Sequence, residues 1–166
     1  MQGSSMNHEK KAVSRSRVVM TQLVLPSHTN SLGSVFGGTV MSWIDIAAAI
    51  AAQRHSGQPV VTASIDQLNF IAPVKLGWVV NLKASVNFVS KTSMEIGVRV
   101  DAENPMTGEV FHTASAYLTF VALNSLGKPS LVPELILETD DDFRRHKNGI
   151  ERRKSRQALR EQTKSK

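Results

Sequence analysis

One segment of the sequence is apolar on every side of the helix that it predicts. Among the thirteen residues from 40 to 52, only Ser42 and Asp45 are polar, and the wider pattern predicts a helix over residues 38–55 that ends at Gly57. A helix that packs on one surface normally has one apolar stripe and one polar face. Because this helix lacks a polar face, it must be covered on several sides. We therefore expect a second copy of the chain to cover the side that its own domain leaves open.

The segments around this helix predict an α+β domain. β-branched and alternating runs predict strands at residues 18–25, 60–70, 78–89, 94–102 and 110–123. One strand, one long helix and then a series of strands favour a helix laid across a curled antiparallel sheet. Within residues 60–70, alternation places Thr62 on the same face as Ser64 and Asp66.

The two ends of the chain differ in composition from the middle. We expect residues 1–17 to form a flexible N-terminal extension, residues 18–138 the folded domain, and residues 139–166 a basic C-terminal helix or tail. Thr139 is the expected N-cap of a short helix with an acidic start. The highly charged residues 150–166 predict a frayed helix or disorder.

Composition excludes several classes of protein. The chain has 166 residues and no Cys, which excludes disulfides, thiolate nucleophiles and cysteine-ligated zinc. No apolar run approaches about 18 residues and residues 1–17 resemble no secretory signal, so we expect a cytoplasmic protein without a membrane partner. The net charge is +6, but residues 18–143 carry eleven acids against six bases. The basic ends are therefore interpreted as solvated tails, and nucleic acid is not expected to be a partner.

Asp45 is the first candidate for chemistry, since an ionised carboxylate among apolar residues needs a partner. It is either satisfied by Ser42 or a backbone amide, or it acts as a general base. Gly37 and Gly38 begin the helix, where unpaired amides can bind a developing oxyanion; the alternative is a tight turn. Asn30 in the preceding loop either makes a turn or holds a water molecule.

Common catalytic motifs are absent. The sequence has no Gly-x-Ser-x-Gly nucleophile elbow, no P-loop and no dinucleotide-binding glycine motif. Its five His residues never fall three or four positions apart, so we expect no zinc site. His112 is interpreted as an ordinary strand residue.

The string Asn30-x-x-Gly33-x-x-x-Gly37-Gly38, followed by Asp45, resembles the hotdog-fold acyl-CoA thioesterases. The likeness covers about residues 18–138 and is greatest to the bacterial single-domain members. Further matches follow in order: Arg54-His55, residues 61–66, Asn69-Phe70, Pro73-Val74, Gly77, residues 92–95, residues 120–123, Gly127-Lys128-Pro129 and Val132-Pro133. Trp78 after Gly77, where the family often has Asp, and Ser90-Lys91, where a Gly commonly precedes the Thr-Ser pair, depart from the pattern.

The resemblance implies a hotdog fold whose sheets join in a dimer, often assembled as a trimer of dimers. It implies hydrolysis of fatty acyl-CoA to a free fatty acid and coenzyme A at the dimer interface, with no metal or redox cofactor. Gly37 or Gly38 would stabilise the oxyanion, and Asn30 would position water or the carbonyl. Asp45 of the opposite subunit would activate water or attack directly.

The resemblance also implies a path for the coenzyme. Pantetheine would run along Val61 and Thr62, and the phosphates would meet Lys91, Thr92 and Ser93, with Arg144 and Arg145 as further donors. The alternative for these donors is solvated surface. Two other functions stay open: a non-catalytic acyl-CoA sensor, and a dehydratase, which usually needs a His that the central helix lacks before His55.

Overall fold

The computed structural model describes residues 9–164. Along the chain its elements are β1 (Lys10–Ala12), the short helix η1 (Val13–Ser16), β2 (Val18–Leu23), η2 (Pro26–His28), α1 (Gly37–Ser56), β3 (Val60–Phe70), β4 (Val79–Val89), β5 (Ser93–Glu103), β6 (Val110–Ala122), β7 (Glu134–Ile136) and α2 (Asp140–Lys164). None of the helices in this part of the chain is long and apolar enough to cross a membrane.

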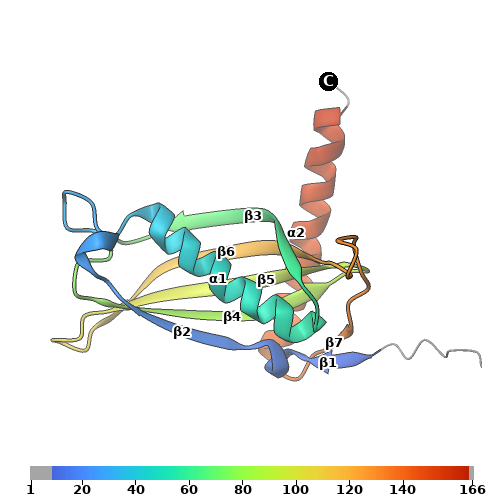
Figure 1. Cartoon of the computed structure of the whole chain (residues 1–166), viewed down its shortest axis with the longest axis horizontal. Helices are drawn as coiled ribbons and strands as arrows, with labels where there is room; N and C mark the ends of the chain where they lie inside the picture. Colours follow the sequence, from blue (N-terminus) through green and yellow to red (C-terminus); the bar gives the residue numbers. More distant parts are fainter. Residues whose placement is uncertain (1–8, 165–166) are drawn as a thin grey trace, which may run out of the picture.

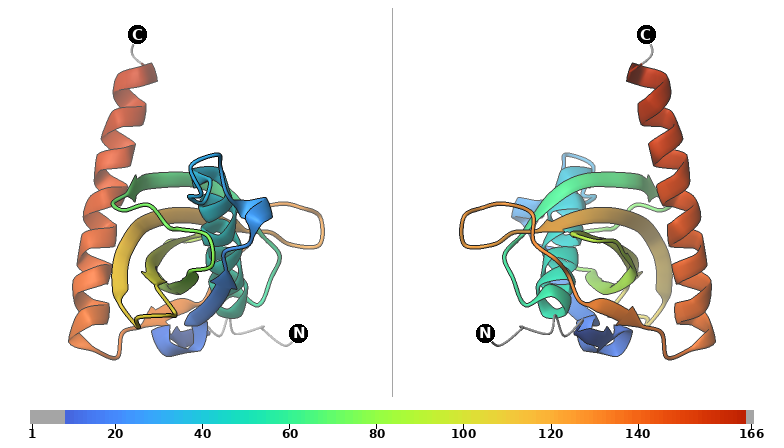
Figure 2. Two further views of the ribbon diagram at one scale, coloured as in Figure 1. Left: turned by 90° about the vertical axis from the view of Figure 1, so that its left-hand side faces the viewer. Right: turned by 90° about the vertical axis from the view of Figure 1, so that its right-hand side faces the viewer.

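The predicted α+β arrangement is confirmed. Five antiparallel strands form one sheet in the order β2-β4-β5-β6-β3, and β1 and β7 form a small parallel pair. Figures 1 and 2 show the large sheet curling around α1, with α2 on its outer face. The sheet therefore has two edges, β2 and β3, and two faces, each of which carries one helix.

Helix α1 packs into the concave face because its small residues permit close approach. The side chains of Ala47, Ala48, Ala51 and Ala52 are completely buried. The helix ends as predicted at Gly57, whose φ of 66° is the left-handed conformation that glycine adopts without strain. The burial is incomplete, however: one side of α1 faces outward, and the side chain of Ile46 is 48% exposed there.

Strand β3 does not alternate as the sequence predicts. Its register with β6 shifts between Thr62 and Ser64 and again between Asp66 and Asn69. Thr62 consequently faces α1, whereas Asp66 binds Arg156 of α2 on the opposite side of the sheet. The prediction that Thr62 and Asp66 share a face is wrong, because the first of these bulges adds a residue between them that alternation does not count.

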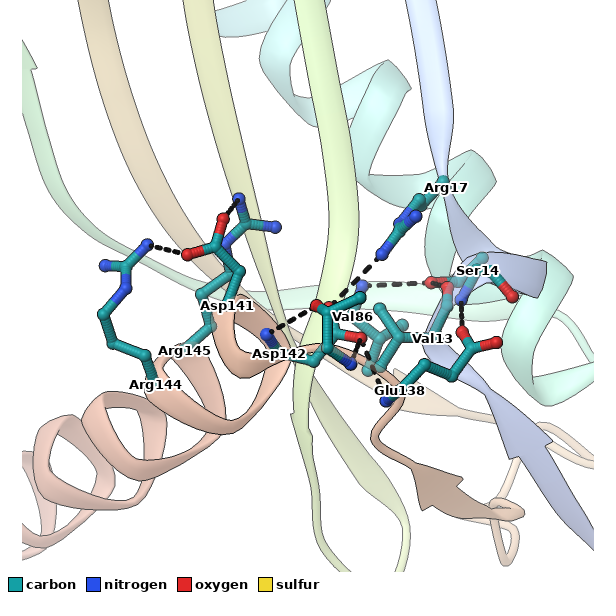
Figure 3. Close-up of polar contacts among 11 residues, drawn as sticks. Val13, Ser14, Arg17, Val86, Glu138, Asp141, Asp142, Arg144 and Arg145 are labelled. Carbon is teal, nitrogen blue, oxygen red and sulfur yellow. Dashed lines mark hydrogen bonds and ion pairs between the residues drawn. The ribbon is translucent and has the colours of Figure 1, made fainter.

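The expected flexible extension is also wrong for the residues that follow residue 8, which lie in β1 and η1. The Ser14 amide donates to Glu138 Oε2 over 2.9 Å, and Arg17 lies 3.4 Å from Asp142 Oδ1. Figure 3 shows these contacts, which join the N-terminal segment to the start of α2. Val13 is 2% exposed, so burial of an apolar side chain also holds the segment in place. The first eight residues of the expected extension lie outside the described residues.

Helix α2 begins as predicted, because the hydroxyl of Thr139 accepts a hydrogen bond from the Asp142 amide over 3.2 Å. It then continues through Lys164 rather than fraying from residue 150. Its attachment is a buried ion pair: Arg152 lies 2.6 Å from Glu95, whose side chain is 1% exposed. Figure 1 shows the last part of α2 extending past β3. Of the two alternatives predicted for this segment, a helix or disorder, the structure has the helix through Lys164, and Glu95, far away in sequence, holds it to the sheet.

Candidate active site

Asp45 and Thr62 are joined by a hydrogen bond between α1 and β3. The Thr62 hydroxyl donates to Asp45 Oδ1 over 2.8 Å. This one contact uses Oδ1 and leaves Oδ2 with no partner among residues 9–164. Asp45 is half-buried rather than enclosed by its own chain, and it lies on the outward side of α1 with Met41 and Ile46. A carboxylate with one oxygen held and one available can accept a proton from a water molecule.

The first amides of α1 are available to bind an anion. Among the residues that the structure describes, the N–H groups of Gly37 and Gly38 have no acceptor, whereas the Thr39 and Val40 amides already donate to the Phe36 carbonyl. A Cβ on Gly37 would lie 3.3 Å from the Phe70 ring, and one on Gly38 would meet open space. Gly37 thus permits close contact with Phe70, and both amides sit at the positive end of the helix dipole.

Asn30 stabilises a turn, which is one of the two roles predicted for it from the sequence. Its Oδ1 accepts hydrogen bonds from the Leu32 amide at 2.9 Å and the Ser34 amide at 3.2 Å. These two donors fix the orientation of the carboxamide, because only its oxygen can accept them. The Nδ2 group has no acceptor within the described chain. Asn30 therefore holds its loop with the oxygen and retains two N–H donors for a ligand.

A groove brings Asn30 and the start of α1 together. Its volume is about 430 Å³, and it is lined mainly by apolar side chains. Asn30, Gly37, Val40, Phe70 and Val74 are among its lining residues. The groove combines an apolar wall with N–H donors, an arrangement that suits an apolar chain ending in a carbonyl group.

Asp45 and Thr62 do not lie in this groove. Gly37 and Asp45 are eight residues apart on one helix, which separates them by about 12 Å along its axis. A single carbonyl group cannot contact both within one chain. The candidate site of a single chain is therefore two separated halves, one with the N–H donors and the other with the carboxylate.

The residues predicted to contact the coenzyme fall into two groups. Ser93 pairs with Val121 of β6, and Thr62 pairs with the adjacent Phe120, so the turn containing Lys91, Thr92 and Ser93 lies near Thr62. Val61, the other residue predicted to line the pantetheine path, precedes Thr62 on the same strand and is 45% exposed. This group is therefore on the same half of the molecule as Asp45.

Arg144 and Arg145 lie elsewhere. Both are on α2 and pair with Asp141, at 3.1 and 3.7 Å. Because α2 covers the outer face of the sheet and Asp45 is on the other, they cannot contact a ligand bound at Asp45 of the same chain (Figure 2). The structure does not bring them into the candidate site.

Two further observations limit the chemistry. No group of three or more His, Cys, Asp or Glu side chains within residues 9–164 could hold a metal ion. His55 is buried, and its Nε2 lies 2.9 Å from the Pro133 carbonyl oxygen. His55 thus lies in the last turn of α1, at the opposite end of the helix from Gly37 and away from both halves of the site.

The chain is similar in sequence to known hydrolases. The profile of a family described as thioesterase superfamily matches residues 32–109. An uncharacterised acyl-CoA thioester hydrolase of Bacillus subtilis is 40% identical over 148 residues, covering 89% of this chain and 86% of that protein. The mouse cytosolic acyl coenzyme A thioester hydrolase is 39% identical, but the chain spans only 38% of its length.

Solved structures are similar over nearly the whole chain. An apo-hexameric acyl-CoA thioesterase has a TM-score of 0.88 and 39% identity, with 91% of this chain and 97% of that chain covered. The acyl-CoA hydrolase of Staphylococcus aureus, solved with butyryl coenzyme A and coenzyme A, has a TM-score of 0.85 and 36% identity, with 94% and 97% covered.

Proposed function

Because the chain belongs to the thioesterase superfamily, and within it to the hotdog-fold acyl-CoA thioester hydrolases, we propose that it hydrolyses fatty acyl-CoA at a site shared by two protomers. Asp45 and Thr62 come from one protomer, and Asn30, Gly37 and Gly38 come from the other. The products are a free fatty acid and coenzyme A. The Staphylococcus aureus hydrolase has also been solved as variants that replace one Asp, one Asn or one Thr by Ala, which are the types of Asp45, Asn30 and Thr62.

The observation that carries this proposal is the separation of the two halves of the site. One chain presents the carboxylate about 12 Å from the free amides of the same helix. In a two-fold related copy, α1 runs in the opposite direction. The Gly37 and Gly38 amides of that copy then lie against Asp45 of the first chain. This arrangement completes two sites in each dimer.

The surface beside Asp45 fits such a partner. Strand β3 is an edge of the sheet, and Val61 and Ile65 on it are 45% and 37% exposed. Met41 and Ile46 on the outward side of α1 are 39% and 48% exposed. An unpaired edge strand beside exposed apolar side chains is a template for strand pairing. We propose that two β3 strands pair and join the two sheets.

In the reaction, the acyl chain lies in the apolar groove, and its carbonyl oxygen faces the Gly37 and Gly38 amides. Asp45 Oδ2 accepts a proton from water while the water oxygen attacks the carbonyl carbon. The two amides and the α1 dipole stabilise the resulting oxyanion. Collapse of the tetrahedral intermediate breaks the carbon–sulfur bond, and the coenzyme A thiolate leaves and takes the proton. The Asn30 amide group donates to the attacking water or the carbonyl.

The coenzyme follows the surface that leads away from Asp45. Pantetheine lies along Val61 and Thr62 at the start of β3, and the phosphates meet the turn of Lys91, Thr92 and Ser93. Lys91 supplies the positive charge, and the two hydroxyls and the turn amides supply donors. Arg144 and Arg145 can contact the coenzyme only from a different protomer. We further propose that three dimers form a hexamer, the assembly of a structural neighbour with 39% identity.

A thiol-release assay over a series of acyl-CoA chain lengths tests this function. We expect stoichiometric release of coenzyme A with saturation kinetics, and faster turnover for chains that fill the groove. Binding of acyl-CoA without release of thiol would contradict hydrolysis and support the acyl-CoA sensor instead. Isothermal titration with a non-hydrolysable thioether analogue provides the binding control.

A further inference from the structure

Three side chains on the outer face of the sheet form a continuous chain of hydrogen bonds. Ser115 Oγ lies 3.0 Å from His112 Nε2, and His112 Nδ1 lies 3.2 Å from Asp101 Oδ1. Ser115 and His112 belong to β6, and Asp101 belongs to the adjacent strand β5. These are the residue types, the atoms and the order of a hydroxyl nucleophile, its general base and the acid that orients the base.

A β-bulge brings the Ser and the His to the same face. On a regular strand, residues three positions apart point to opposite faces of the sheet. The register between β5 and β6 shifts between Val100 and Asp101, so Thr113 has no pairing partner there. This extra residue turns His112 to the face that holds Ser115. Bulges of this kind often re-aim a side chain at functional sites.

The charge on Asp101 sets the tautomer of His112. Burial raises the pKa of Asp101, but hydrogen bonds from Arg99 and His112 outweigh burial and leave this pKa below its ordinary value. Asp101 is therefore ionised at neutral pH and can accept a hydrogen bond from the Nδ1–H group of His112. In the tautomer that carries its proton on Nδ1, His112 can accept the hydroxyl hydrogen of Ser115 at Nε2.

Ser115 also opens onto a cleft. The cleft has a volume of about 810 Å³ and lies between the outer face of the sheet and the first turns of α2. Arg99 and Asn69 pair with Ser115 on its two neighbouring strands. Arg99 binds Asp101 through Nε, and its two Nη groups have no partner in the described part of the chain. They can donate to an oxyanion formed at Ser115, and Lys83 adds a positive charge to the cleft wall.

We propose that Ser115, His112 and Asp101 form a second hydrolytic site, separate from Asp45, that takes carboxylic esters bearing an anionic group. Ser115 Oγ forms a bond to the ester carbonyl carbon while its proton passes to His112 Nε2. The carbon–oxygen bond to the alcohol breaks, and the alcohol leaves with that proton. Water, deprotonated by His112, then cleaves the acyl-serine, releases the acid and restores Ser115. Lys83 and Arg99 attract the anionic group and the oxyanion.

The test uses the full-length Asp45→Asn variant, so that the thioesterase site does not contribute. A fluorophosphonate probe should label Ser115, as located by mass spectrometry of the digested protein, and 4-nitrophenyl hemisuccinate should be hydrolysed faster than 4-nitrophenyl acetate. Adding Ser115→Ala or His112→Gln should abolish labelling and lower ester hydrolysis by about tenfold or more. Ser85→Ala is the matched control, because Ser85 lines the same cleft without a His partner.

Two results would overturn the second site. One is the absence of a label on Ser115 under conditions that label a known serine hydrolase. The other is ester hydrolysis that is unchanged by Ser115→Ala. Acyl-CoA hydrolysis by the single variant Ser115→Ala, with Asp45 intact, should equal that of the wild type, which shows that the fold and the first site are preserved. If the Ser115→Ala variant loses both acyl-CoA hydrolysis and its fold, as measured by circular dichroism, this result would also contradict an independent site.

Discussion

Thr62 Oγ1 lies 2.8 Å from Asp45 Oδ1, so a hydrogen bond joins the central helix to the edge strand at the carboxylate itself. The hydroxyl fixes one carboxylate oxygen and leaves the other without a partner among residues 9–164. It also connects the residue proposed as the base to the strand proposed to pair with a partner. A shift of β3 would therefore change the position of the Asp45 carboxylate.

Replacing Asp45 by Asn should lower kcat by about 10²-fold or more, because the carboxamide cannot accept a proton from water. The fold should survive, since Asn keeps an oxygen that can accept the Thr62 hydrogen bond. A thiol-release assay beside a thermal melt separates the two effects. Ser42→Ala on the same outward side of α1 is the control and should retain activity. Turnover near that of the wild type would exclude Asp45 as the base.

Thr62→Val should lower kcat by about tenfold, because the carboxylate loses the donor that holds its orientation. Thr62→Ser retains a hydroxyl and should recover most of the rate. The KM for acyl-CoA should change less than kcat in both variants. If the Thr62→Val and Thr62→Ser variants have the same kcat, the hydroxyl has no role in orienting Asp45.

Asn30 offers a separation of loop structure from donor function. Asn30→Asp keeps an oxygen for the Leu32 and Ser34 amides but loses the N–H donors, so it should melt like the wild type with a kcat about tenfold to a hundredfold lower. Asn30→Ala should lose both activity and loop order. Hydrogen exchange at the Leu32 and Ser34 amides reports the loop. An active Asp variant would restrict Asn30 to its turn.

The shared site can be tested by mixing variants. In a mixed dimer of Asp45→Asn and Asn30→Ala chains, one of the two sites contains both native residues. Co-expression in equal amounts should restore about a quarter of the wild-type rate, because half of randomly formed two-fold dimers are mixed. Co-expression of two differently tagged Asp45→Asn chains is the control and should restore nothing. A mixture no faster than its separate components would place the whole site within one chain.

Asp142 predicts how stability depends on pH. Burial raises its pKa, but hydrogen bonds from the Glu138 and Thr139 amides and the Thr139 side chain, together with Arg17, leave it below the ordinary value. The ionised form therefore stabilises the folded state above the pKa of the unfolded chain, and this contribution is lost as the pH falls through the folded pKa.

Urea unfolding between pH 7 and pH 3 should show Asp142→Asn less stable than the wild type at neutral pH. The difference should shrink below about pH 4, where the unfolded carboxylate also takes up a proton. Asp140→Asn, an exposed position in the same turn, provides the comparison. A constant difference across this range would contradict the linkage.

Local pattern predicts α1 from a long run of apolar residues, and it predicts most of the long strands from their alternating or β-branched residues. The thirteen residues 40–52, of which only two are polar, predict the helix and lead us to expect a partner that covers it. Gly37 and Asp45 could be placed at the start and in the middle of this helix, and Asn30 in the loop before it. The distance between Gly37 and Asp45 follows from the rise of a helix.

The contacts that the sequence did not reveal depend on distant residues. The Thr62 hydrogen bond depends on bulges in β3, which alternation cannot register. Helix α2 has the composition of a disordered tail, and its order depends on Glu95 meeting Arg152 across 57 positions. Glu95 gave no distinct signal in the sequence, because Arg99, Asp101 and Glu103 are further charged residues on the same strand.

The overhang of α2 beyond β3 has a consequence for assembly. An incoming strand at this edge must also leave room for the part of α2 that extends past β3. A second copy of the chain, with its own α2 in the symmetric position, can leave this room. A continuous stack of extended peptides cannot. We expect this overhang to disfavour repeated addition of strands at the β3 edge and to permit pairing with one symmetric partner.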